Sequence, residues 1–200
     1  MTAPRDSQIL KLFRRLGVVR AGDLEARGIP RARIYRLARK GLVERQARGL
    51  YTASRHPITA GHTLVQVAKR VPGGVFCLLT ALRFHELTTQ APAEVWIALG
   101  EKARKPKLDY PRLRVARFSG PALTEGIETH RLEGVDIRVY SAAKTVADCF
   151  KYRNEIGIDV AIEALRDFSR HHRGGSTELA HYARVCRVSR VMQSYLDAIA

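Results

Sequence analysis

The sequence predicts an α+β fold, with a small basic module at the N-terminus and a larger mixed α/β region that ends in helices. Three observations lead to this prediction. Residues 20–51 have the pattern of two short helices around a glycine turn, followed by two short strands. Positive charge is concentrated in the same part of the chain, since residues 1–56 hold 14 Lys and Arg against 4 Asp and Glu. Beyond residue 59, helical and strand-like patterns alternate, which indicates a second domain of mixed structure.

The composition is that of an ordinary globular protein with an unusual charge. The 200 residues are 46% hydrophobic and 27% charged, which is enough to bury a proper core. The net charge of +16 favours a polyanionic partner, with nucleic acid ahead of an acidic membrane surface. A basic protein without such a partner is the alternative. The first residues, MTAPRDSQ, lack an apolar signal region, and no apolar run approaches ~18 residues, which predicts a cytoplasmic protein with no membrane partner.

The first helix is expected from Ser7, as its N-cap, to about Leu16. Its apolar positions recur at helical spacing, and Gly17 ends it. Residues 18–19 are expected to form a short strand that pairs with a later hairpin. A second helix over residues 21–27 is followed by Gly28, which supplies the turn to the next helix.

The helix from Pro30 to Lys40 is the main candidate for DNA recognition. Its inner stripe is narrow, and most of its other positions are cationic. A recognition helix reads bases with its N-terminal half and holds phosphates with its flanks. The predicted base-reading residues are Arg31, Arg33, Tyr35 and Arg36, and the predicted phosphate contacts are Arg39 and Lys40. The alternative is a basic helix face that only faces solvent.

A small β-hairpin follows this helix and completes the pattern of a winged helix-turn-helix. Its strands are expected over residues 42–45 and 49–52, with Leu42 and Leu50 facing inward and Val43 as a further inward candidate. Arg45 and Arg48 near the tip are placed to contact the DNA backbone or a minor groove. The polar segment that follows predicts a boundary between a DNA-binding domain, 1–56, and a C-terminal domain, 57–200.

The C-terminal domain is expected to contain both strands and helices. A two-residue turn at Glu133-Gly134 predicts a hairpin, and Ser141 is expected to cap the helix after it. The expected helices are 59–70, 80–87, 142–150, 159–169, 176–185 and 189–199, and the expected strands are 75–77, 94–99, 113–118, 127–132 and 135–140.

One further basic cluster lies in this domain. The segment 101–117 carries seven Lys and Arg against two acids, with two prolines, and is expected to be an exposed loop that runs into a strand. Its cations are either solvated or a second contact with the DNA backbone. The candidates for that contact are Lys102, Arg104, Lys105 and Lys107.

No catalytic constellation stands out, and no cofactor or metal is expected. The cysteines Cys77, Cys149 and Cys186 form no C-x-x-C pair and are expected to be reduced core residues. Four residues with metal-binding chemistry match no closed zinc pattern, namely His171, His172, His181 and Cys186. A metal-dependent nuclease remains an alternative, with residue types supplied by Glu94, Glu101, Lys102, Asp136 and Asp148. A protein-interaction module is the third class considered.

Three segments resemble the AbiEi antitoxin family of type IV toxin–antitoxin systems. They are GVVRAGDLEARGIPRARIYRLARKGLVERQARGLY, CLLTALRFHELTTQAPAEVWIAL and YSAAKTVADCFKYRNEIGIDVAIEALRD. The resemblance covers most of the chain and keeps the order of the segments. Many regulators share the first pattern, whereas its occurrence together with the third is more specific.

The resemblance implies a winged-helix domain followed by a larger antitoxin domain. It also implies an autorepressor that binds inverted repeats of double-stranded DNA in its own promoter and counters a nucleotidyltransferase-type toxin, without forming a stable complex with that toxin. The DNA contacts of the family correspond here to the cations of residues 30–40 and of the wing. The family has no catalytic residues, and the role of residues 175–200 stays open.

Overall fold

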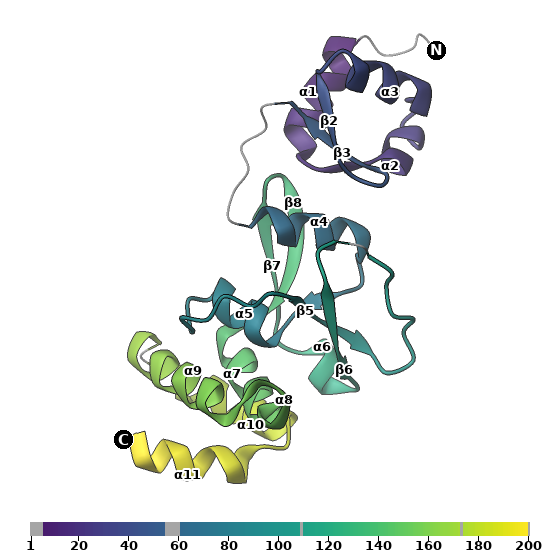
Figure 1. Cartoon of the computed structure of the whole chain (residues 1–200). Helices are drawn as coiled ribbons and strands as arrows, with labels where there is room; N and C mark the ends of the chain where they lie inside the picture. The colour runs from purple at the N-terminus through teal and green to yellow at the C-terminus, as the bar shows by residue number, and fades with distance from the viewer. Residues whose placement is uncertain (1–5, 55–60, 109, 173, 200) are drawn as a thin grey trace. The chain divides into compact units, whose positions relative to one another are not determined.

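The computed structural model describes residues 6–54, 61–108, 110–172 and 174–199 (Figure 1). The chain divides into two compact units. The first comprises Met1–Pro72 and His130–Ile137, and the second comprises Gly73–Thr129 and Arg138–Ala200. The predicted boundary near residue 56 lies outside the described residues, so the division at that position stays a prediction.

The first unit contains the elements of a winged helix-turn-helix. Its three strands form an antiparallel sheet in the order β1-β3-β2, in which Val19 pairs with Tyr51. The early strand therefore pairs with the hairpin, as the sequence predicted. The elements are α1 (Asp6–Leu16), β1 (Val19–Arg20), α2 (Ala21–Glu25), α3 (Arg31–Arg39), β2 (Val43–Ala47), β3 (Leu50–Ala53) and α4 (His62–Arg70).

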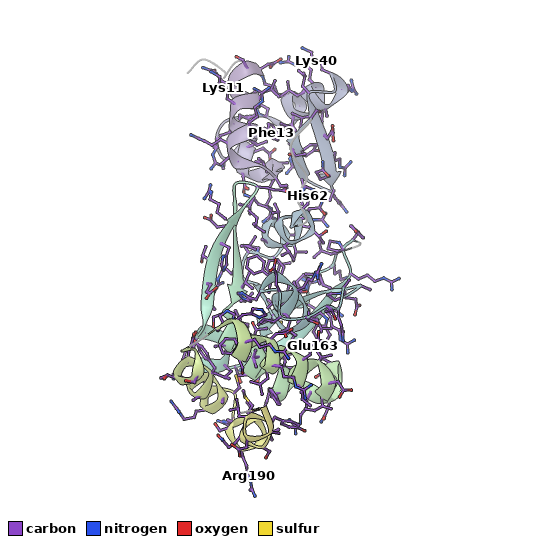
Figure 2. All side chains as sticks on the ribbon, turned by 90° about the vertical axis from the view of Figure 1, so that its left-hand side faces the viewer. Lys11, Phe13, Lys40, His62, Glu163 and Arg190 are labelled. Carbon is purple, nitrogen blue, oxygen red and sulfur yellow. The ribbon has the colours of Figure 1, made fainter. Side chains whose placement is uncertain are left out.

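The helices of this module are held by one apolar cluster. Phe13 of α1 is fully buried and lies inside the module (Figure 2), where it joins Leu24 of α2 and Leu37 of α3. Gly28, with φ of 74°, supplies the left-handed turn between α2 and α3 that the sequence predicted. Gly41, with φ of 67°, follows the end of α3.

Several local expectations about this module were wrong. Leu42 is 40% exposed, whereas Val43 is 2% exposed, because the strand begins one residue later than expected and each shift of one residue exchanges the faces of a strand. The helix begins at Asp6 and not after a Ser7 cap. Pro30 is the N-cap of α3 and not its first residue. The hairpin turn lies at Arg48-Gly49, because β2 continues through Ala47 with a bulge.

A second apolar cluster of the first unit includes the tip of the hairpin formed by β7 (Ile127–Leu132) and β8 (Val135–Tyr140). Val135 packs there with Val18, Leu50 and Val65. The two turn residues, Glu133 and Gly134, have φ of 47° and 76°, as a tight two-residue turn requires. A Cβ on Gly134 would lie 2.8 Å from the carbonyl oxygen of Arg15, so the close approach of the two backbones also requires glycine.

The second unit is built on a five-stranded mixed sheet in the order β6-β5-β4-β8-β7. Strand β4 pairs antiparallel with β5 and parallel with β8, and β5 pairs parallel with β6. Its further elements are β4 (Val75–Phe76), α5 (Leu78–Phe84), β5 (Val95–Gly100), β6 (Leu113–Phe118), α6 (Pro121–Thr124), α7 (Ala142–Lys151), α8 (Arg153–Ile156), α9 (Ile158–His171), α10 (Ser176–Val185) and α11 (Ser189–Ile199). Among the described residues, no helix is long and apolar enough to span a membrane.

Most of the predicted elements of this unit are present. The strands β6, β7 and β8 and the helices α10 and α11 have the predicted bounds. The cap of α7 is also as expected, since the Ser141 side chain accepts a hydrogen bond from the backbone N–H of Lys144. Helix α5 begins two residues earlier than expected, directly after the extended residue Cys77, whose side chain gives no capping signal. The short helices α6 and α8 were not predicted.

A buried ion pair lies in the core of the second unit. Lys144 and Asp148 are one turn apart on α7, and Nζ of Lys144 lies 2.6 Å from both carboxylate oxygens. Both residues are fully buried, and Cys186 donates its thiol hydrogen to Asp148. Nζ of Lys144 also lies 4.1 Å from the centre of the Tyr140 ring. The pair is enclosed by apolar and aromatic groups, so removing one partner would leave an uncompensated charge.

Burial controls the protonation of this site. Desolvation raises the pKa of Asp148 from 3.8 to about 6, although Lys144 and Cys186 oppose this shift. Desolvation also raises the pKa of the neighbouring thiols of Cys77 and Cys149, so these groups stay neutral at mildly acidic pH. The carboxyl group of Asp148 is therefore the group of this cluster that titrates in that range.

We expect the free energy of unfolding to contain a contribution from Asp148 that falls as the pH rises from about 4 to about 6. In this window the folded protein holds the proton that the unfolded chain has released, so raising the pH favours unfolding. The measurement is chemical denaturation as a function of pH. The control is the double variant Lys144→Met/Asp148→Asn, which removes both charges and should lack this contribution. Identical pH profiles of the two proteins would contradict the assignment.

Candidate nucleic-acid interface

Helix α3 is fixed in the first unit by a narrow apolar stripe. Ile34 and Leu37 are fully buried, and the backbone N–H of Leu42 donates to the carbonyl oxygen of Leu37 just beyond the helix. The offset of three residues places both side chains on one face. The opposite face of α3 is therefore turned outward.

This outward face carries most of the residues predicted to bind DNA. Its exposed residues are Arg31, Ala32, Tyr35, Arg36, Arg39 and Lys40. Tyr35 is 50% exposed, and its ring centre lies 6.4 Å from that of Tyr51 on β3. Lys40 lies at the end of α3, on the outside of the module (Figure 2).

The carboxylate of Asp6 binds one side of this cationic helix. Arg33 donates through Nε and Arg36 donates through Nη2 to the same oxygen, Oδ1, each at 3.1 Å. Nζ of Lys40 lies 3.7 Å from Oδ2. The hydrogen bond from Arg33 is the largest of the causes that act on the pKa of Asp6, desolvation opposes it, and the hydrogen bond and charge of Arg36 help to keep this pKa lowered. Asp6 is therefore an anion held by three cations of α3.

The predicted cations of α3 thus differ in their environment. The side chain of Arg33 is only 19% exposed, whereas that of Arg36 is 55% exposed. Arg31 forms an exposed pair with Glu25, with Nε 2.8 Å from Oε1. Such exposed pairs contribute little to stability, about 0–1 kcal/mol. The pair with Glu25 therefore opposes the binding of Arg31 to a new partner only weakly.

The wing contributes two further exposed cations to the same unit. Arg45 lies on β2, and its Nε donates to the carbonyl oxygen of Ala47 at 3.4 Å. Arg48 lies in the turn, and its own carbonyl oxygen accepts a hydrogen bond from Arg70 of α4. The eight candidate residues of the N-terminal module are therefore distributed over α3, its C-terminal cap and the wing of one compact unit.

The second basic cluster belongs to the other unit and lies in the crossover between β5 and β6. Its four candidate residues, Lys102, Arg104, Lys105 and Lys107, are all exposed. Arg117 fixes the start of this crossover, since its Nη1 donates to the carbonyl oxygens of Gly100 and Ala103 at 2.7 Å each. The Arg114 guanidinium lies 4.6 Å from the centre of the Trp96 ring.

The residues considered for metal binding and catalysis do not converge. His171 contacts a backbone carbonyl on its own helix, and His172 stacks on Phe168. Asp148 belongs to the buried ion pair with Lys144 and accepts the thiol hydrogen of Cys186, whereas His181 pairs with Glu125 at the surface. Within the part of the chain that the structure describes, no three His, Cys, Asp or Glu side chains form a group suited to a metal ion.

The fold and the charge of the first unit define a class of protein. Three helices and a small antiparallel sheet, with a basic helix after the turn, form a winged helix-turn-helix of the DNA-binding kind. Residues 7–53, from α1 to β3, match the family model described as a transcriptional regulator, AbiEi antitoxin. This match confirms the resemblance to the AbiEi family over these residues. A comparison with curated proteins found no match.

Sequence reasoning missed Asp6 as a residue of this interface. It lies 27 residues before Arg33 and outside the helix that Ser7 was expected to cap. The sequence gives no local signal for a contact at that distance. Its only indication is that Asp6 is one of four acids among 14 cations in residues 1–56.

Proposed function

We propose that this protein is a cytoplasmic antitoxin and transcriptional autorepressor, which binds inverted repeats in its own promoter and counters a nucleotidyltransferase-type toxin. Residues 1–56 act as the DNA-binding domain, and residues 57–200 act as the antitoxin domain. The match of residues 7–53 to AbiEi transcriptional regulators supports the regulatory role. The observation that carries the proposal is the exposed cationic face of α3 on the second helix of the helix-turn-helix.

The chemistry of this face fits double-stranded DNA. Arginine binds guanine through two hydrogen bonds in the major groove, and lysine contacts phosphate without reading sequence. Arg31 and Arg36 lie on the exposed side of α3, with Tyr35 between them. They form the proposed base-reading group, and Arg33 supports it from the side. Arg39 and Lys40 at the end of the helix, together with Arg45 and Arg48 on the wing, hold the backbone.

We expect the variants Arg36→Ala and Lys40→Ala to distinguish base recognition by α3 from its contacts with the DNA phosphates. Loss of a base-reading arginine should weaken binding to the promoter by about 1–3 kcal/mol and relax sequence preference. Loss of Lys40 should weaken binding to all sequences alike. It should also reduce the salt slope, which is the steepness of the fall of the logarithm of the binding constant with the logarithm of the salt concentration, by about 1. The measurement is a gel shift with the promoter fragment and with a shuffled fragment of equal length. Unchanged affinity and preference in both variants would remove α3 from the interface.

The crossover between β5 and β6 is proposed as a second contact with the DNA backbone. It carries four exposed cations on a segment that Arg117 ties to the sheet. Side chains of this kind bind phosphate without sequence preference and release counterions.

We expect Lys102→Gln/Lys105→Gln to reduce the salt slope of promoter binding by about 1–2, with sequence preference unchanged. A matched control is Arg166→Gln/Arg170→Gln on α9, which removes the same charge from another exposed part of the second unit. Equal effects of the two double variants would show that general charge, and not this crossover, sets the slope.

The antitoxic action is proposed to reside in the C-terminal domain and to work without a stable complex. We expect Arg36→Ala protein, expressed from an independent promoter, to rescue growth of cells that express a nucleotidyltransferase-type toxin as well as the unaltered protein does. Growth of the cells is the measurement. Loss of rescue in this variant would tie neutralisation to DNA binding. A toxin that co-purifies at fixed stoichiometry would contradict a mechanism without a complex.

A further inference from the structure

The contact between Asp6 and helix α3 has a consequence for how the proposed DNA-binding surface selects its target. A single carboxylate faces three cations that are spaced along one side of the helix, at Arg33, Arg36 and Lys40. Offsets of three and four residues align these side chains in one row. Rows of this kind are well suited to bind phosphates, and Asp6 occupies the place on the protein where such an anion would be held.

The two arginines use different donors for this contact. Arg33 donates through Nε to Oδ1 of Asp6 at 3.1 Å, its Nη2 lies at the same distance from that oxygen, and its side chain is mostly buried. Arg36 uses Nη2 alone and is 55% exposed. A guanidinium group has five N–H donors in a rigid fork, and Nε and Nη1 of Arg36 have no partner among the described residues, so they can bind another group.

We propose that Asp6 is a positioning residue that sets the sequence selectivity of DNA binding by this protein. Its carboxylate orients Arg36 toward a base edge and keeps Arg33 from binding phosphates indiscriminately, while the more distant Lys40, at 3.7 Å, still contacts the DNA backbone. This inference rests on the proposed function. A phosphate must displace the carboxylate in order to bind Arg33, whereas a guanine is bound by the donors of Arg36 that Asp6 leaves open.

The electrostatics of the site support an ionised Asp6 during DNA binding. The arginines lower the pKa of this carboxyl group, so it carries its charge at neutral pH. The side chain is 30% exposed, and the residues that anchor α1 are Ile9 and Phe13, which are buried elsewhere on the helix. Replacement of the carboxylate by an amide therefore leaves the apolar anchoring of α1 intact.

The test compares the full-length protein with Asp6→Asn, on the promoter fragment and on a shuffled fragment, at several salt concentrations. Each cation released to phosphate should steepen the salt slope by about 0.9 and strengthen binding on the order of fivefold at 0.15 M salt. We expect Asp6→Asn to bind shuffled DNA at least fivefold more tightly, with a steeper slope, and to lose most of its preference for the promoter.

Two further variants separate positioning from charge and from stability. Asp136→Asn removes one negative charge from the same unit, at an exposed pair with Arg131 whose atoms lie 2.7 Å apart, and leaves α3 untouched. It should keep the preference of the unaltered protein. Asp6→Glu retains the charge and should restore most of that preference. A role for Asp6 in stability alone would change thermal unfolding but not the ratio of the two affinities.

The outcomes are distinct. An unaltered protein that binds no promoter DNA would overturn both the proposed function and this inference. Promoter binding with the same preference in Asp6→Asn as in Asp136→Asn would overturn the inference and leave the proposed function standing. Weaker binding of both fragments by Asp6→Asn would also overturn the inference alone, because Asp6 would then only support the fold.

Discussion

The first unit depends on the balance between charge repulsion along α3 and burial of its apolar stripe. Five cations lie among the ten residues from Arg31 to Lys40. Like charges at offsets of three or four residues destabilise an isolated helix by about 0.2–0.5 kcal/mol per pair. Burial of Ile34 and Leu37, at about 1.5–3 kcal/mol each, outweighs this repulsion. The helix is therefore held by the module around it, and Asp6 and Glu25 reduce the repulsion further.

The second unit solves a different electrostatic problem. Its charged pair is removed from water, so contacts within the protein must compensate for the lost hydration of the two charges. Lys144 meets both oxygens of Asp148 and lies over an aromatic face, while Ser141 at the start of α7 bonds to Glu178 of α10. These contacts fix the rotation of α7 relative to the helices that pack on it. A buried pair of this kind is weak evidence for added stability. A packing arrangement that separated the two residues, however, would leave an unpaired charge in the core. The network therefore disfavours alternative arrangements of α7 and α10.

The fold class and most elements were predictable because their signals are local. Glycines at the turns, the Ser141 cap and the Glu133-Gly134 turn each act within a few residues. The wrong predictions concern positions at which tertiary contacts determine the local structure. The face of Leu42 depends on where β2 begins its pairing with β3, and the contact of Asp6 with Arg33 joins residues that are 27 positions apart. The AbiEi resemblance is confirmed for residues 7–53 and stays a prediction elsewhere.

The candidate site also depends on tertiary contacts that the local sequence does not predict. In the sequence, Arg31, Arg33 and Arg36 are equivalent cations on one helix, and nothing local ranks them. Their ranking follows from what each guanidinium already binds. Among the described residues, Arg31 has one exposed carboxylate partner, Arg33 donates to Asp6 from a mostly buried side chain, and Arg36 contacts Asp6 through Nη2 alone from an exposed side chain. Selectivity in a highly basic protein requires such differences, because equally free cations would bind any phosphate backbone. The carboxylate that creates them comes from α1, at the other end of the module's sequence, so the proposed recognition by α3 is a property of the folded unit and not of the helix alone.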